Sequence, residues 1–312
     1  MSLTKLTADL DNIQALSNKP NEVEGLTADQ LKEKFDDAGN EIKTYVNDTL
    51  TAEQDTINAD VESRLSTAEG EIDTAETNII NLKTGWNAIS ATLTYSSADD
   101  PTYVVGTSVD LTGILSVGMK IKLTQTTAKY FFVTAIDSTT ITLYGGTDYT
   151  LANAAISNVY YSTEKAPFGF PLDIDKWSVV TISNAYAVQN TPTQNVYYNP
   201  SSLNLVVPIG KWNLGWCANA YPQRASAAIC EQQCGLSTST SSFTDPKLNG
   251  SVYGESNTKF LLTICRENTV TLTSKTTYYL LARTTQTNMS SIAYLGSDTY
   301  GNTIIKATIA YL

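Results

Sequence analysis

The sequence predicts two kinds of structure in one chain: an N-terminal α-helical parallel coiled coil, followed by all-β domains. Three observations predict this fold class. Residues 1–86 hold 18 of the 31 acidic residues and only 7 of the 20 basic residues. Apolar residues recur with helical spacing up to residue 86. After it, apolar and polar residues alternate as they do in strands.

Composition excludes several classes of function. Residues 1–86 carry a net charge of −11, and residues 87–312 are neutral. This balance argues against binding to nucleic acid or to anionic membranes. The sequence has no histidine, so Ser-His-Asp and Cys-His catalysis and the commonest metal ligand are absent. No apolar run approaches the ~18 residues that cross a bilayer, and the start lacks the features of a secretory signal. We expect no membrane insertion and no cofactor, and we name no metal ligands on this basis.

The apolar residues with helical spacing form a stripe along one face of a predicted helix. This stripe begins after residues 1–25, whose secondary structure is ambiguous from the sequence. Thr27 and Gln30 form a capping-box pattern that predicts a helix start. Nothing else in this part of the chain could cover the stripe, so we expect identical helices to pack on it. The alternative is an antiparallel helical hairpin that breaks near Gly39 or residues 49–51. The predicted core positions of the coiled coil are Leu31, Phe35, Ile42, Ile57, Val61, Leu65, Ile72, Ile79, Leu82 and Trp86.

The remainder reads as β structure. Residues 120–143 combine alternating strands with a turn at residues 137–140 and predict a small β domain. Strand-like runs from residue 172 onward, separated by turn signals, predict a β-sandwich. Trp212 and Trp216 fall on one face of a strand, so we expect them in its core.

The four cysteines all lie in the second half of the chain. For a chain made in the cytosol, we expect reduced, buried thiols, and a disulfide could form after release from the cell. Cys230 and Cys234 form a C-x3-C pair, but no second pair completes a zinc-ribbon pattern.

Three segments carry a resemblance to the receptor-binding proteins of Gram-positive siphophage tails and phage-tail-like bacteriocins. Residues 21–40 resemble the start of the helical stalk of such proteins. Residues 85–161, with the runs 120–132 and 146–155, resemble their small β shoulder module. Val207-Pro-Ile-Gly-Lys-Trp212, with residues 278–280 and 306–312, is similar to a tumour-necrosis-factor-like trimeric head.

The resemblance implies an elongated homotrimer with a jelly-roll-like β-sandwich head at its C-terminal end. It also implies an N-terminus docked on a tail baseplate protein, a head that binds host cell-wall saccharide, and a location in the virion tail. The implied division is 1–25 for attachment, 26–86 for the stalk, 87–166 for the shoulder and 167–312 for the head.

Candidate saccharide-binding residues lie in turn-like stretches of the head, because binding residues concentrate on loops of rigid scaffolds. Arg224 offers a bidentate fork for a phosphate-bearing teichoic acid. An ion pair with an acidic residue at a subunit interface is an equal alternative for this side chain. Asp298 could bind Ca²⁺, although no EF-hand spacing is present. The candidates are Arg224, Phe243, Asp245, Tyr253, Asp298 and Tyr300.

The function expected on this basis is attachment of a tail to host cell-wall saccharide, without enzymatic activity. One alternative is a structural baseplate or fibre subunit that does not bind the host. Another is a polysaccharide depolymerase, which would need two facing carboxylates. The sequence contains neither a recognisable carboxylate pair nor the solenoid repeat that would favour a depolymerase. We therefore name no catalytic residues.

Overall fold

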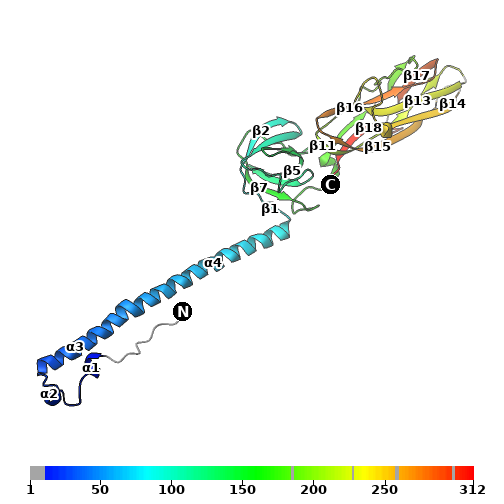
Figure 1. Ribbon diagram of the computed structural model, residues 1–312. Coiled ribbons are helices and arrows are strands. Elements are labelled where there is room, and N and C mark those ends of the chain that lie inside the picture. The colour runs from blue at the N-terminus through cyan, green and yellow to red at the C-terminus, as the bar shows by residue number, and fades with distance from the viewer. Residues whose placement is uncertain (1–10, 184–185, 227, 257–259, 297–298) are drawn as a thin grey trace. The chain divides into compact units, whose positions relative to one another are not determined.

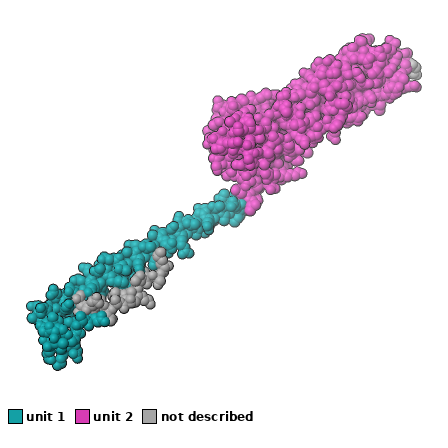
Figure 2. All heavy atoms as spheres, in the orientation of Figure 1, with its two compact units in different colours: residues 1–80 teal, residues 81–312 magenta. Residues whose placement is uncertain are grey.

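The structure is a computed structural model that describes residues 11–183, 186–226, 228–256, 260–296 and 299–312. The chain divides into two compact units, residues 1–80 and 81–312 (Figures 1 and 2). Each unit is described by itself.

The first unit is built from helices. The capping box at its main helix is confirmed: Gln30 N donates to Thr27 Oγ1 at 3.3 Å, and Thr27 N donates to Gln30 Oε1 at 2.9 Å. The helical elements are α1 (Asp11–Gln14), α2 (Pro20–Val23), α3 (Ala28–Thr44), the π-helical segment η1 (Tyr45–Leu50) and α4 (Thr51–Thr84).

The helix runs without a break from Ala28 to Thr84, so the alternative of a helical hairpin is wrong. At the position of the suspected break, η1 changes the hydrogen-bond spacing but keeps the helix going. The Thr51 hydroxyl donates to the Val46 carbonyl oxygen at 2.8 Å across this segment.

The predicted fold class is wrong in its N-terminal part and in its assembly. The structure has one helix followed by a mostly antiparallel β-sandwich, and it shows neither a parallel coiled coil nor an elongated trimer. Phe35, Leu65, Ile72, Ile79 and Leu82 are each more than half exposed. The reason is physical: periodic apolar residues specify a helix with an apolar face, but they do not specify what lies against that face.

The second unit begins with a seven-stranded antiparallel sheet. Its core holds Leu123, Phe131, Val133, Ile141 and Leu143, all fully buried, and its strand order is β1-β7-β4-β5-β6-β3-β2. The strands are β1 (Asn87–Ala88), β2 (Leu93–Asp99), β3 (Thr102–Thr107), β4 (Lys120–Gln125), β5 (Thr127–Ile136), β6 (Thr140–Tyr144) and β7 (Ser157–Ser162).

Two further sheets pack face to face as a sandwich. One has the order β10-β16-β13-β14. The other has the order β12-β17-β11-β18-β8, with β15 paired to β11 and β9 paired to β17. The elements are η2 (Ile174–Trp177), β8 (Ser178–Ser183), β9 (Ala187–Asn190), β10 (Asn204–Val207), β11 (Gly210–Ala220), β12 (Gln223–Arg224), β13 (Ala228–Ser237), η3 (Pro246–Leu248), β14 (Asn249–Ser256), β15 (Leu262–Leu272), β16 (Thr276–Arg283), β17 (Met289–Tyr294) and β18 (Thr303–Ile309).

Trp212 and Trp216 are buried in the sandwich, which confirms the prediction from strand alternation. The indole Nε1 of Trp216 donates to the Leu248 carbonyl oxygen at 2.8 Å. This aromatic strand face is therefore used for packing in the core.

Trp86 departs from the heptad prediction, because the helix ends at Thr84 and the indole is buried against β structure. Its Nε1 donates to the Phe168 carbonyl oxygen at 2.8 Å. Nearby, Phe170 stacks on Trp177 with ring centroids 5.1 Å apart. This aromatic core joins the seven-stranded sheet to the sandwich.

The expectation of four reduced cysteines is wrong for two of them. Cys217 on β11 and Cys265 on β15 form a disulfide at directly paired positions of the two strands. Cys230 and Cys234 are free and buried. Burial raises the pKa of the Cys234 thiol to about 12.

Candidate functional site

The candidate site lies on the outer face of the four-stranded sheet. Strand pairing aligns Ser251 on β14, Gln233 on β13 and Arg283 on β16 in one row across the sheet. Gln232, the neighbour of Gln233, is fully buried and bonds to Ala293 of the opposite sheet. Since successive side chains alternate between faces, the row containing Gln233 faces away from the sandwich core.

An aromatic side chain lies on the sheet beside this row. A Cβ on Gly235 would come within 3.0 Å of the Phe243 ring, so the glycine leaves the space in which Phe243 lies. The Phe243 ring meets Tyr197 edge-on, with centroids 4.9 Å apart. The Arg283 guanidinium lies 4.9 Å from the Tyr197 centroid and 5.7 Å from that of Phe243.

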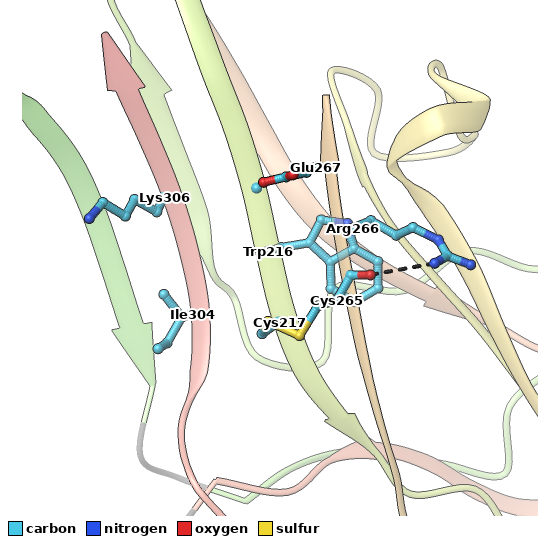
Figure 3. A pocket seen from close by; sticks show the side chains of 8 residues that line it. Trp216, Cys217, Cys265, Arg266, Glu267, Ile304 and Lys306 are labelled. Carbon is cyan, nitrogen blue, oxygen red and sulfur yellow. Dashed lines mark hydrogen bonds between the residues drawn. A yellow bond between two sulfur atoms is a disulfide. The ribbon is translucent and has the colours of Figure 1, made fainter. Parts of the chain in front are cut away.

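A second guanidinium reaches the same place from β15. Arg266 Nε donates to the Asn249 carbonyl oxygen at 3.0 Å, and Nη1 lies 3.5 Å from the Cys265 carbonyl oxygen. A Cβ on Gly250 would meet Ile264 Cγ2 at 2.8 Å, so this glycine leaves the space in which the Ile264 side chain of β15 packs against β14. Figure 3 shows the guanidinium on the side of β15 away from Ile304 and Lys306.

These side chains border a hollow of about 400 Å³, which we call the arginine pocket. Its chemistry combines two guanidinium forks, two amides, a hydroxyl and an aromatic ring. The residues of the arginine pocket are Gln233, Phe243, Asn249, Gly250, Ser251, Arg266 and Arg283.

Neither arginine of the pocket forms an ion pair with a residue that the structure describes. All the ion pairs among the described residues use lysine side chains, so neither guanidinium meets a carboxylate there. Arg283 Nε instead donates to Gln233 Oε1 at 2.6 Å. The remaining N–H groups of these forks can serve an anionic or hydroxyl-rich ligand.

The carboxylates near the pocket are engaged in hydrogen bonds. Glu231 accepts from Gln233 Nε2 at 2.7 Å and from the backbone and hydroxyl of Thr285. Asp245 accepts from Asn268 Nδ2 at 2.7 Å. Both carboxylates therefore stabilise the structure around the site through these hydrogen bonds.

Of the predicted saccharide-binding residues, Phe243 lines the arginine pocket, and Asp245 supports its surroundings. Tyr253 follows Ser251 by two positions on β14 and therefore shares its face, with 60% of its surface exposed. Asp298 lies outside the described residues.

The structure places the other two candidates outside the residues that line the pocket. Arg224 is partly buried on β12, where Nη1 donates to the Ile229 carbonyl oxygen at 3.0 Å. Tyr300 is 54% exposed, and its carbonyl oxygen accepts from Asn219.

Sequence reasoning missed Arg266, Arg283 and Gln233. Alternation along residues 278–283 already puts Arg283 on the face opposite to Tyr278. No local pattern signals that Arg266 comes to the same place, because β15 and β16 belong to different sheets.

A second hollow of about 550 Å³ lies on the other sheet, at the disulfide. Figure 3 shows Ile304 and Lys306 on one side of Cys217 and Cys265, with Glu267 nearby. Lys306 is already paired with Asp175 at 3.1 Å. This surface is mostly apolar and offers little to a sugar, so the arginine pocket is the stronger candidate.

The described residues contain no cluster of three or more histidine, cysteine or acidic side chains that could hold a metal ion. None of the helices in the described part of the chain combines the length and apolarity needed to cross a membrane.

Comparison with known proteins assigns no family. No family model matches the sequence, and no curated protein matches it. Among solved structures, a chain of dimeric latent PorU from Porphyromonas gingivalis is similar over 72% of this chain and 24% of its own length, at 12% identity and a TM-score of 0.25. This chain thus spans about a quarter of that protein, and a likeness at this level carries no argument about fold or function.

Proposed function

We propose that the protein is a receptor-binding protein of a phage tail or tail-like particle, and that it binds host cell-wall saccharide through the arginine pocket. The observation that carries the proposal is the pair of guanidinium groups of Arg266 and Arg283, which border the pocket together with Phe243 and form no ion pair with any described carboxylate. Aromatic rings pack against the apolar faces of sugars, and arginine forks bind their anionic substituents.

A phosphate-bearing wall polymer such as teichoic acid fits this chemistry best. Each guanidinium can donate two parallel hydrogen bonds to one phosphate. Gln233, Asn249 and Ser251 add donors and acceptors for hydroxyl groups. The chain as a whole is acidic, with a net charge of −11, so attraction to a polyanion has to be local to this pocket.

Binding without hydrolysis is part of the proposal. A glycosidase needs a carboxylic acid and a carboxylate on opposite sides of the scissile bond. Two acids, Glu231 and Asp245, are held by hydrogen bonds to Thr285, Gln233 and Asn268. We assign them a supporting role.

The test is depletion of the full-length protein by purified Gram-positive cell walls, before and after hydrofluoric acid removes phosphodiester-linked polymers. We expect binding to untreated walls, and loss of binding after the treatment. Arg283→Gln should weaken binding by about tenfold or more, and Arg283→Lys should restore only part of it, because lysine lacks the fork. Lys211→Gln, which removes an exposed charge on β11, is the matched control.

Two outcomes would favour the other functions. If the folded protein binds none of a broad panel of walls, a structural tail subunit becomes the better account. If it releases reducing ends from the walls, it is a depolymerase.

A further inference from the structure

A chain of hydrogen bonds connects a buried carboxylate to one arginine of the pocket. Glu231 on β13 is only 7% exposed. One of its carboxylate oxygens accepts from the Thr285 backbone N–H at 3.2 Å and from the Thr285 hydroxyl. The other accepts from Gln233 Nε2 at 2.7 Å, and Gln233 Oε1 accepts from Arg283 Nε at 2.6 Å. The Gln233 amide therefore links a fixed carboxylate to a guanidinium.

The chemistry at the two ends of this chain fixes the orientation of the amide. A carboxylate only accepts hydrogen bonds, and a guanidinium only donates them. Gln233 therefore has to turn its NH₂ group toward Glu231 and its oxygen toward Arg283. The opposite orientation would place two acceptors together at one end and two donors at the other, and both hydrogen bonds would be lost.

The same amide determines which edge of the guanidinium is free. Arg283 binds Gln233 through Nε, and its two Nη groups donate to no residue that the structure describes. The guanidinium carbon lies 4.9 Å from the Tyr197 centroid and 5.7 Å from that of Phe243, so the rings limit its position as well. The fork formed by the two Nη groups is left for a ligand of the pocket.

We propose that Glu231 is a positioning residue of the arginine pocket: through Gln233, it orients the Arg283 guanidinium so that the two Nη groups meet the ligand. The inference rests on the proposed function, because it explains how that binding site is preorganised. Glu231 is not among the residues that line the pocket, so it acts through the amide. A fork that is already oriented loses less side-chain freedom when the ligand binds.

Glu231→Gln tests this chain with a side chain of the same size. The backbone N–H and hydroxyl of Thr285 need an acceptor, so they bind the amide oxygen of the new side chain. Its NH₂ group then faces Gln233, whose amide has to turn over and present its own NH₂ group to Arg283. Two donors meet there, and the Arg283 Nε–H loses its acceptor.

NMR of the arginine Nε–H groups of the full-length protein, without ligand, follows this hydrogen bond directly. The sequence has four arginines, so single Arg→Lys variants can assign the signals. We expect Glu231→Gln to speed the exchange of the Arg283 Nε–H with water by about tenfold, because a hydrogen bond of a charged group is lost. Arg266 is the matched control, since its Nε donates to the Asn249 carbonyl oxygen and should exchange as before.

A reciprocal variant separates positioning from a general loss of structure. Glu231→Gln/Gln233→Glu keeps the net charge and exchanges the two groups, so an acceptor faces Arg283 Nε again. We expect the slow exchange of the Arg283 Nε–H to return in this double variant. A role of Glu231 in local stability alone would not be rescued in this way.

Cell-wall depletion gives the functional readout. Glu231→Gln should bind walls about tenfold more weakly, because one charged fork is no longer oriented. The proposal is overturned if the Arg283 Nε–H exchanges equally fast in Glu231→Gln and the wild type, if the reciprocal variant does not restore slow exchange, or if folded Glu231→Gln binds walls as tightly as the wild type. An absence of wall binding by the wild type would instead overturn the proposed function, and the exchange rates would still report whether Glu231 orients Arg283.

Discussion

Gly235 shows how one residue shapes the arginine pocket. A Cβ at this position would lie 2.3 Å from Asn249 Oδ1 and 3.0 Å from the Phe243 ring. We predict that Gly235→Ala displaces Phe243 and costs about 1–3 kcal/mol of folding stability through overpacking. Urea unfolding measures the loss of folding stability. Cell-wall depletion measures the effect of displacing Phe243, and we expect the folded variant to bind more weakly than the wild type.

Gly215 on β11 is the control for this substitution. A Cβ there would meet the Arg266 carbonyl oxygen and the Glu267 Cβ at an ordinary 3.5 Å. Gly215→Ala should keep wall binding and leave stability unchanged, or raise it by up to about 1 kcal/mol. Equal behaviour of the two variants would contradict the packing role of Gly235.

Residue-level prediction succeeded where a side chain's local surroundings decide its place. The burial of Trp212 and Trp216 was predicted from alternation along one strand. Arg224 was named because it lies in a turn-like stretch, where binding residues concentrate, and Arg266 and Arg283 were not considered as ligands. The convergence of two arginines depends on how the edges of two sheets meet, and sequence spacing contains no information about that.

At the scale of elements, the turn between β5 and β6 depends on one carboxylate. Asp137 accepts hydrogen bonds from the backbone and hydroxyl groups of Thr139 and Thr140, at 2.7–3.0 Å. Led by the bond from the Thr140 hydroxyl, these contacts lower the pKa of Asp137 to about 2.

The sign of the effect follows from linkage. A carboxylate whose pKa is lowered in the folded state stabilises that state at pH values above the pKa of the unfolded chain, which is about 4. This contribution disappears as the pH falls through the folded-state pKa of about 2. Asp137→Asn should therefore destabilise the protein at pH 6. The difference between the free energies of unfolding of the variant and the wild type should become smaller toward pH 2. An Asp137 carboxyl resonance that titrates near pH 4 would contradict this.

The disulfide between β11 and β15 is a second element-level feature with a clear test. It closes a loop of 48 residues, so its reduction should cost about 2–4 kcal/mol of stability. Because Arg266 follows Cys265 directly, reduction should also weaken wall binding. Alkylation in denaturant without reductant should label Cys230 and Cys234 only, and labelling of all four cysteines would exclude the disulfide.

Strands and the helix start were predictable because their signals are local. Alternation located the strands of both β regions, and the capping box located the start of α3. The assembly of the helix was not predictable in the same way. An apolar stripe reports that a helix has two different faces, and the structure contains a single helix where a coiled coil was expected.

At the scale of the whole chain, charge and aromatic residues are used in different places. Acidic residues dominate the helical unit, where they are solvated, and aromatic residues unite the sheets of the second unit. The segment around Phe170, expected as a boundary between β domains, contributes its ring to this shared core. The sandwich that carries the arginine pocket therefore shares an aromatic core with the sheet before it.

The most direct test of the central claim is the dissociation constant of the full-length protein on untreated cell walls, measured for the wild type and for Arg266→Gln/Arg283→Gln. The account predicts that the double variant keeps the wild-type Tm within a few degrees and binds about a hundredfold more weakly, because it lacks both charged forks. A folded double variant that binds the walls as tightly as the wild type would contradict the assignment of the arginine pocket.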